Sequence, residues 1–202
     1  MGVPILIIGE SGSGKSYSIK GLPPEETGIF SVEKGRLPFK GDFKVKKKAT
    51  YRDINGIFKE PKLKRYVIDD SQFLMVNAMF DRAKETGYGK YTDFALDFRN
   101  LVHNVNFLLP DDVLVFFLHH TETDPNSGKV KAKTVGKMID QYLTLEGCFD
   151  IVIYCQDHKF FTQSNGQSTA KTPEDMFPLE IPNDLKLVDD AIRDYYGLKE
   201  DK

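Results

Sequence analysis

The chain has 202 residues, of which 40% are hydrophobic and 29% are charged, and its formal net charge is −2 at pH 7. This composition excludes collagen-like, low-complexity and wholly disordered proteins, and the charge excludes a uniformly basic nucleic-acid-binding protein. A chain of this length buries about 70% of its unfolded surface on folding, so we expect one domain over residues 1–202 that needs no disulfide or metal for its core.

Five short runs of mostly apolar residues predict the strands of a parallel sheet. Each run is too short for a typical helix and ends in glycine or polar residues. In chain order they cover residues 3–8, 29–32, 66–68, 113–118 and 151–154. Strands that are apolar on both faces are covered by helices on both sides. The sequence therefore predicts an α/β fold with a mostly parallel central sheet.

Helical patterns lie between and after these runs, with apolar side chains three and four residues apart. They cover residues 14–20, 71–85, 91–109, 137–146 and 184–196. Asn183 or Asp184 suits the N-cap of the last helix, and Gly197 suits its C-terminal end. A turn is predicted at residues 124–128. The Asn-Gly pair at 165–166, between residues 159–163 and 168–171, predicts a β-hairpin.

Charge is distributed unevenly along the chain. Residues 40–65 contain ten Lys and Arg against three Asp and Glu, whereas residues 174–202 contain nine acidic residues against four basic ones. The lysine run at 44–48 has two interpretations, a solvated strand or loop and a contact with a polyanion.

The sequence also gives expectations for the cellular compartment of the protein and for its association with membranes. Two cysteines, Cys148 and Cys155, are too few for a disulfide scaffold and fit no metal-binding pattern, which favours a reducing intracellular location. The apolar runs are far shorter than the roughly 20 residues of a membrane-spanning helix, so we expect no membrane association. The first residues lack the basic flank of a signal peptide.

The strongest motif follows the first predicted strand. The residues from Gly9 to Ser16 fit the Walker A pattern G-x-x-x-x-G-K-[ST], with a strand before it and a helical pattern after it. Its glycines let backbone N–H groups approach phosphate, while Lys15 suits the β- and γ-phosphates and Ser16 suits Mg²⁺. We therefore expect ATP and Mg²⁺ to bind here. The expected nucleotide-binding residues are Gly9, Glu10, Ser11, Gly12, Ser13, Gly14, Lys15, Ser16 and Tyr17.

Two carboxylates follow the third predicted strand, which resembles a Walker B strand. Asp69 comes directly after the apolar run, so we expect it near Mg²⁺ together with Ser16. Asp70 is a further candidate for the metal, although alternation along the strand directs it to the opposite side, where it could orient water or a loop. The alternative is that both carboxylates cap the helix that starts near residue 71.

Two other strand ends carry candidates for hydrolysis. Glu33 ends the second strand, where a carboxylate can act as general base or orient water. His120 ends the fourth strand, where it can contact the γ-phosphate, and His119 is the second choice. The alternative for Glu33 is a plain surface glutamate. The alternative for the two histidines is that they are simply hydrogen-bonded at a strand end. Adjacent histidines on a strand point to opposite faces, which argues against a shared metal.

The order of these parts resembles the core of RecA-like ATPases. In detail, the chain is similar to compact phage and prophage nucleotide-binding proteins of the AAA family, which include RecA-like single-strand annealing proteins. The most specific segments are SVEKG at 31–35 and AKTPEDMFP at 170–178, and the resemblance runs from residue 3 to residue 196. It implies a RecA-like P-loop fold with a C-terminal β-hairpin and helix.

The resemblance also implies roles for several lysines. Lys171 matches a lysine that reaches the γ-phosphate held by a neighbouring subunit in RecA-like assemblies, which implies a homo-oligomer. Residues 121–136 correspond to a DNA-contacting loop, and lysines at alternate positions would line one face of an extended segment. These lysines, with one just beyond the loop, are Lys129, Lys131, Lys133 and Lys137. The alternative for Lys171 is a plain surface lysine.

The resemblance thus implies a Mg²⁺-dependent ATPase that acts on single-stranded DNA in phage recombination or replication. Its partners would be phage replication and recombination proteins, in the cytoplasm of a bacterial host. Two alternatives stay open, namely an ATP-dependent switch such as a helicase loader, which would dispense with Glu33, and a small-molecule kinase. The six arginines are scattered singly and form no arginine-rich lid, which disfavours the kinase.

Overall fold

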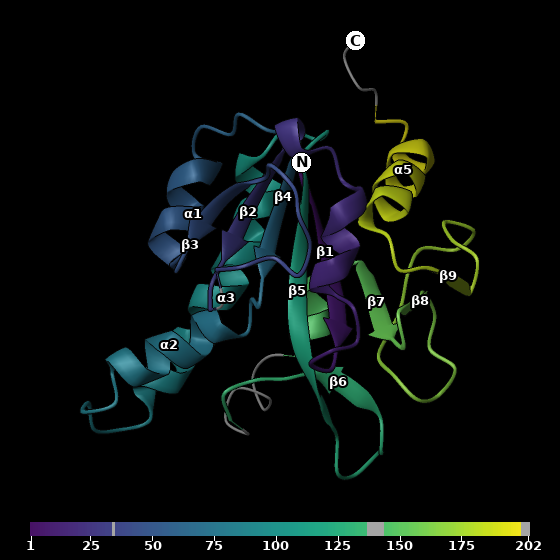
Figure 1. Cartoon of the computed structure of the whole chain (residues 1–202). Helices are drawn as coiled ribbons and strands as arrows, with labels where there is room; N and C mark the ends of the chain where they lie inside the picture. Colours follow the sequence, from purple (N-terminus) through teal and green to yellow (C-terminus); the bar gives the residue numbers. More distant parts are fainter. Residues whose placement is uncertain (34, 137–143, 199–202) are drawn as a thin grey trace.

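A central sheet organises the computed structural model, which describes residues 1–33, 35–136 and 144–198 (Figure 1). Within these ranges nine strands form one sheet in the order β3-β2-β4-β5-β1-β7-β8-β9, and β6 pairs with β5 outside this row. The strands are β1 (Val3–Gly9), β2 (Thr27–Ser31), β3 (Lys44–Lys47), β4 (Arg65–Asp69), β5 (Leu114–Thr123), β6 (Val130–Ala132), β7 (Ile151–Gln156), β8 (Lys159–Phe161) and β9 (Glu180–Pro182).

Most neighbouring strands of this sheet run parallel. The pairs from β3 through β2, β4, β5 and β1 to β7 are all parallel, whereas β8 is antiparallel to both of its neighbours and β6 is antiparallel to β5. The prediction of an α/β fold with a mostly parallel sheet is confirmed. All five expected strands are present, and the fourth is longer than predicted because β5 continues through both histidines to Thr123.

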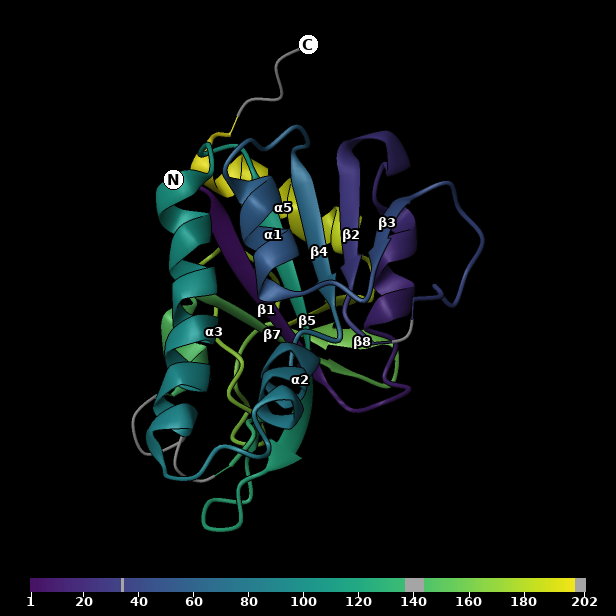
Figure 2. The same cartoon turned by 90° about the vertical axis from the view of Figure 1, so that its left-hand side faces the viewer.

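Helices cover both faces of the sheet (Figures 1 and 2). Helices α1, α2 and α3 pack with one set of alternating strand residues, which includes Leu6 and Phe117, while η1 and α5 pack with the other set, which includes Ile7 and Phe116. The helices and 3₁₀ turns are η1 (Ser16–Gly21), η2 (Pro24–Glu26), α1 (Tyr51–Phe58), α2 (Phe73–Asp81), α3 (Gly89–Leu108), η3 (Leu145–Cys148) and α5 (Leu185–Tyr196). No described helix combines the length and apolar character needed to cross a bilayer.

The two longest helices match their predictions. Helix α3 starts and ends within two residues of the expected bounds, and α5 begins after Asp184, whose side chain accepts a hydrogen bond from Lys186 N at 2.8 Å. Gly197 follows α5 with φ of 64°, the left-handed C-terminal position. The sequence pattern is reliable here because each helix presents a continuous apolar stripe to the sheet.

Three other helix predictions need correction or lie outside the description. The helix expected at 14–20 is the short 3₁₀ helix η1, which the Pro23-Pro24 pair helps to end, and α2 is shorter than the expected 71–85. Of the helix expected at 137–146, residues 137–143 lie outside the described residues.

The basic segment contains two elements that were not predicted. Lys44–Lys47 form the edge strand β3, whose lysines are exposed, in agreement with a solvated strand, while the contact with a polyanion stays a prediction. Helix α1 follows, with a capping box in which Asp53 N donates to the Thr50 hydroxyl and Thr50 N donates to Asp53. That exchange lowers the Asp53 pKa, because hydrogen bonds from Thr50 stabilise its charged form.

The predicted hairpin of residues 159–163 with 168–171 is wrong. Strand β8 instead pairs with β7 and β9, and Lys171 forms a bridge with Val152 of β7. The tight turn lies at Asp157 and His158, which have φ of 49° and 58°, and it joins β7 to β8. The turn at residues 124–128 is confirmed, since Gly128 N donates to Asp124 O at 2.8 Å between β5 and β6.

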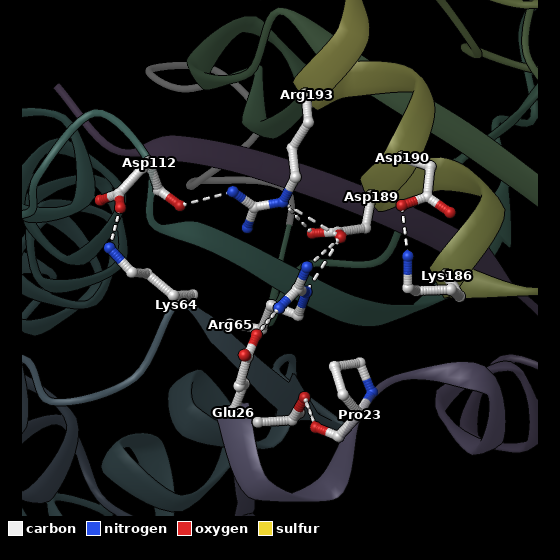
Figure 3. A network of polar contacts seen from close by, with 10 residues as sticks. Pro23, Glu26, Lys64, Arg65, Asp112, Lys186, Asp189, Asp190 and Arg193 are labelled. Atoms are coloured by element: carbon white, nitrogen blue, oxygen red, sulfur yellow. Dashed lines mark hydrogen bonds and ion pairs between the residues drawn. The ribbon is translucent and has the colours of Figure 1, made fainter. Parts of the chain in front are cut away.

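A buried ion-pair network ties α5 to the amino-terminal end of β4 (Figure 3). Arg65 Nη2 lies 2.7 Å from Asp189 Oδ2, and both side chains are at most 1% exposed. Arg193 Nε lies 3.1 Å from the other oxygen of Asp189, and Arg65 also pairs with Glu26. The network therefore joins a helix on one face to the start of a central strand.

Candidate functional site

The predicted Walker A loop begins where β1 meets β7. Gly9 is the last residue of β1, and a Cβ atom there would lie 2.7 Å from the Ser13 hydroxyl oxygen. Gly12 and Gly14 have φ angles of 84° and 107°, which side chains disfavour. The loop backbone therefore depends on glycine at all three positions.

The side chain of Lys15 lies inside this loop. It is buried, and Nζ donates to Gly9 O at 2.7 Å and to Glu10 O at 2.8 Å. The ammonium group thus lies across the carbonyl groups at the end of β1.

Ser16 and Asp69 come together although 53 residues separate them. The Ser16 hydroxyl donates to Asp69 Oδ1 at 2.8 Å, which joins the start of η1 to the end of β4. A hydroxyl beside a carboxylate is the type of oxygen pair that Mg²⁺ takes in combination with phosphate groups, so these residues fit that ion. The described residues contain no group of three His, Cys, Asp and Glu side chains that could hold a metal unaided.

A pocket of about 290 Å³ lies along the loop. Asp70 and His120 both line it, and His120 Nε2 lies 3.0 Å from Asp70 Oδ1. Asp70 has φ of 60°, so the chain turns sharply after β4 and this carboxylate reaches the pocket instead of the opposite side of the strand. The lining residues are Ser11, Gly12, Gly14, Lys15, Ser16, Tyr17, Pro38, Asp70, His120 and His158.

The two adjacent histidines have different surroundings. His119 is fully buried; its Nε2 contacts Lys133 O and its Nδ1 contacts the Ser71 hydroxyl, both at 2.8 Å. Because a carbonyl only accepts, Nε2 carries the proton and Nδ1 accepts from Ser71. Burial lowers the His119 pKa to about 4, so the ring is neutral at neutral pH. His120 is therefore the histidine that faces the pocket, as preferred from the sequence.

Two residues, one in the β7–β8 turn and one directly after β9, pack against the phosphate loop and were not predicted to do so. Asn183 Nδ2 donates to Gly14 O at 3.0 Å, and His158 N donates to Ser13 O at 3.1 Å. The Cys155 thiol also donates to Ser13 O at 3.2 Å, and burial raises its pKa to about 11, so it is a neutral packing group. The sequence marked Asn183 only as a candidate N-cap of the last helix, whereas His158 lies in a polar turn between two apolar strands.

Neither Glu33 nor Lys171 is among the described residues that line this pocket. Glu33 follows β2 as an exposed residue. Lys171 is also exposed, and its backbone pairs with Val152 of β7. Val152 is paired with Leu6 of β1, and Leu6 lies three residues before Gly9, where the loop begins. Lys171 is therefore level with the middle of β1 and not with its end.

The predicted DNA-contacting lysines lie on and next to the β5–β6 hairpin. Lys129 and Lys133 are exposed, whereas Lys131 pairs with Glu122 at 3.3 Å across the hairpin. Because Lys129, Lys131 and Lys133 occupy alternate positions, we expect them on one face of the extended segment. Lys137 lies outside the described residues.

Comparison with known proteins leaves the family open. No protein-family model matches the chain, and a comparison with curated protein sequences finds no match.

Proposed function

We propose that this protein binds ATP with Mg²⁺ along the loop from Gly9 to Ser16 and hydrolyses it. The observation that carries the proposal is the hydrogen bond between Ser16 and Asp69 beside the buried Lys15. A chance glycine-rich turn would not bring the motif hydroxyl to a carboxylate at the end of another strand. The mostly parallel sheet, in which Asp69 ends β4 and Gly9 at the end of β1 lies beside His120 of β5, supports a RecA-like P-loop core.

The residues have separable roles in this proposal. Loop N–H groups and the Lys15 ammonium bind and orient the phosphates, and Lys15 exchanges its bonds to Gly9 O and Glu10 O for phosphate oxygens. Ser16 and Asp69 would hold Mg²⁺, which neutralises phosphate charge when bound. The Asp70–His120 pair, which lines the pocket, would orient water.

A nucleotide-dependent switch is the second candidate, and one observation favours it. Glu33, the residue expected to orient water, is exposed and is not among the described residues that line the pocket. Hydrolysis by the isolated chain would then be slow, and nucleotide binding itself would carry the signal. Measured turnover separates the two candidates.

Single-stranded DNA and self-association belong to the same proposal. Exposed Lys129 and Lys133 suit a phosphate backbone without sequence readout, and Lys131 contributes less because Glu122 pairs with it. Lys171 lies away from the pocket of its own chain, so its proposed contact with a γ-phosphate requires a second copy. The setting would be phage recombination or replication.

Nucleotide binding by a Lys15→Ala variant tests the proposal. We expect affinity for an ATP analogue with Mg²⁺ to fall at least about tenfold, because a charge-assisted contact to phosphate is lost. Lys84→Ala, an exposed lysine after α2, serves as the matched control and should bind like the wild type. ATP turnover is measured with and without single-stranded DNA. Unchanged affinity in Lys15→Ala would contradict the proposed site.

A further inference from the structure

A groove lies between helix α1 and strands β2 and β3, at the edge of the sheet far from the phosphate loop. It encloses about 760 Å³, and its apolar lining includes Val45, Ile57 and Leu63. Ile57 is 45% exposed although it is a large apolar side chain. An apolar surface with this exposure marks a place where a partner can bind.

The border of the groove carries more positive than negative side chains. Lys44, Lys46 and Lys62 line it, against the carboxylates of Asp53 and Glu60. Lys46 pairs with Asp53 at 3.1 Å, whereas Lys44 and Lys62 form no ion pair within the described residues. The surrounding segment is also mainly basic, since residues 40–65 contain ten basic and three acidic residues, and the basic side chains other than Lys64 and Arg65 are exposed. The groove therefore suits an acidic segment with an apolar side chain.

Such a segment lies at the opposite edge of the sheet. Residues 174–180, which we call the acidic loop, expose Glu174, Asp175 and Glu180 together with Leu179. Leu179 is 72% exposed, although its carbonyl accepts a hydrogen bond from Thr162 N at 3.1 Å. Buried Met176 anchors the same loop in the core. The backbone is thus fixed while a large apolar side chain faces outward between carboxylates.

The sheet topology prevents the two surfaces from meeting within one chain. Strand β3 ends the row of strands on one side and β9 ends it on the other, as Figure 1 shows. Contact between them therefore requires two copies. Because the surfaces differ, the contact is head-to-tail, and the assembly keeps a free groove at one end and a free acidic loop at the other.

We propose that the acidic loop of one copy docks in the groove of a second copy. Leu179 packs on the apolar lining near Ile57, and the carboxylates of Glu174 and Asp175 approach Lys44 and Lys62. The match of charge and of exposed apolar side chains between two opposite edges carries this inference. It goes beyond the nucleotide site and requires no nucleotide.

Sedimentation of the full chain without nucleotide tests the proposal. At low salt, the mean mass should rise with concentration up to about 100 µM, a range that populates contacts with micromolar dissociation constants. Leu179→Asp and Ile57→Asp should each weaken association at least about tenfold, because each places a carboxylate in an apolar contact. Leu96→Asp, an equally exposed position on α3, is the matched control.

Mixing the two variants gives the sharpest outcome. Leu179→Asp keeps an intact groove and Ile57→Asp keeps an intact acidic loop, so the mixture should form dimers that grow no further. Added salt should weaken them because the rim contacts are charged. A wild type that stays monomeric at every concentration, or variants that associate like the wild type, would overturn the proposal. Since nucleotide is absent, that result would leave the proposed ATP site unaffected.

Discussion

Two glycines inside the phosphate loop have similar backbone angles but different surroundings. Gly12 has φ of 84°, and nothing lies within 4 Å of the position that a Cβ atom would take. Gly14 has φ of 107°, and a Cβ atom there would collide with the side chains of Asn183 and His158. Gly12 is therefore constrained by its backbone angle alone, and Gly14 by its backbone and by packing.

This difference predicts unequal effects of alanine at the two positions. Gly12→Ala should cost about 1 kcal/mol of unfolding free energy, because a left-handed backbone disfavours a side chain. Gly14→Ala should cost more and should also weaken nucleotide-analogue binding, since relief of the collision moves the loop. Urea unfolding and analogue titration measure both effects. Equal losses of unfolding free energy and of analogue affinity in the two variants would contradict the packing role of Asn183 and His158.

The motif residues of the site were predictable, and their tertiary neighbours were not. Lys15, Ser16 and Asp69 were expected together because the loop pattern and a strand-end carboxylate are local features of the sequence. Asp70 reaches the pocket through a left-handed turn that alternation along a strand does not predict. Asn183 is 169 residues from Gly14 in the sequence, and only the tertiary fold brings the two into contact.

Helix α5 is held to the sheet by apolar packing and by one buried carboxylate. Asp189 accepts from both Arg65 and Arg193, and it is fully buried (Figure 3). Asp190, the next residue, pairs with Lys186 of the same helix at the surface. The two neighbouring aspartates therefore form a matched pair for measuring the effect of burial.

We expect Asp189→Ala to lower the free energy of unfolding by about 3–5 kcal/mol, because Arg65 is left as a buried charge without this partner. Asp190→Ala should change it little, since an exposed pair on one helix contributes weakly. Chemical denaturation of both variants measures the difference. A mild effect of Asp189→Ala would mean that Glu26 or solvent compensates for the lost carboxylate.

At the scale of elements, prediction succeeded where apolar periodicity was strong. The five buried strands and helices α3 and α5 have it, whereas β3 consists of three lysines around Val45 and was not recognised. The expected hairpin failed because an Asn-Gly pair marks a turn without stating which strands pair. The actual tight turn uses Asp157 and His158, both with positive φ.

At the scale of the molecule, the order of strands decides which residues meet. Strand β5 lies between β1 and β4, so the ends of β1 and β4 and the middle of β5, which are distant in sequence, converge on the loop. Short apolar runs predict a parallel sheet but do not specify this order. The opposite positions of the basic and acidic segments likewise became visible only in the fold.

His119 links the stability of the whole domain to pH. It lies in the middle of β5, where it contacts the Phe98 ring of α3, the Ser71 hydroxyl and Lys133 O. Burial is the main cause of its lowered pKa, and the charges of His120 and Lys15 act in the same direction. The folded protein therefore resists protonation of this ring.

The sign of the effect follows from proton uptake. In the unfolded chain His119 has a pKa near 6.5, and in the folded protein it is about 4. Between these values the unfolded state binds more protons, so stability falls as pH decreases from 6.5 towards 4 and is fully present above 6.5. The full contribution of this group is about 3 kcal/mol.

A His119→Gln variant should therefore lose much of this pH dependence. Glutamine keeps a donor for Lys133 O but does not titrate, so the difference in unfolding free energy from the wild type should shrink as pH falls from 6.5 to 4. Urea unfolding at several pH values gives the two slopes. His103→Gln, a half-buried position on α3, is the control and should keep the wild-type slope. Parallel curves for the wild type and His119→Gln would show that other groups account for the acid sensitivity.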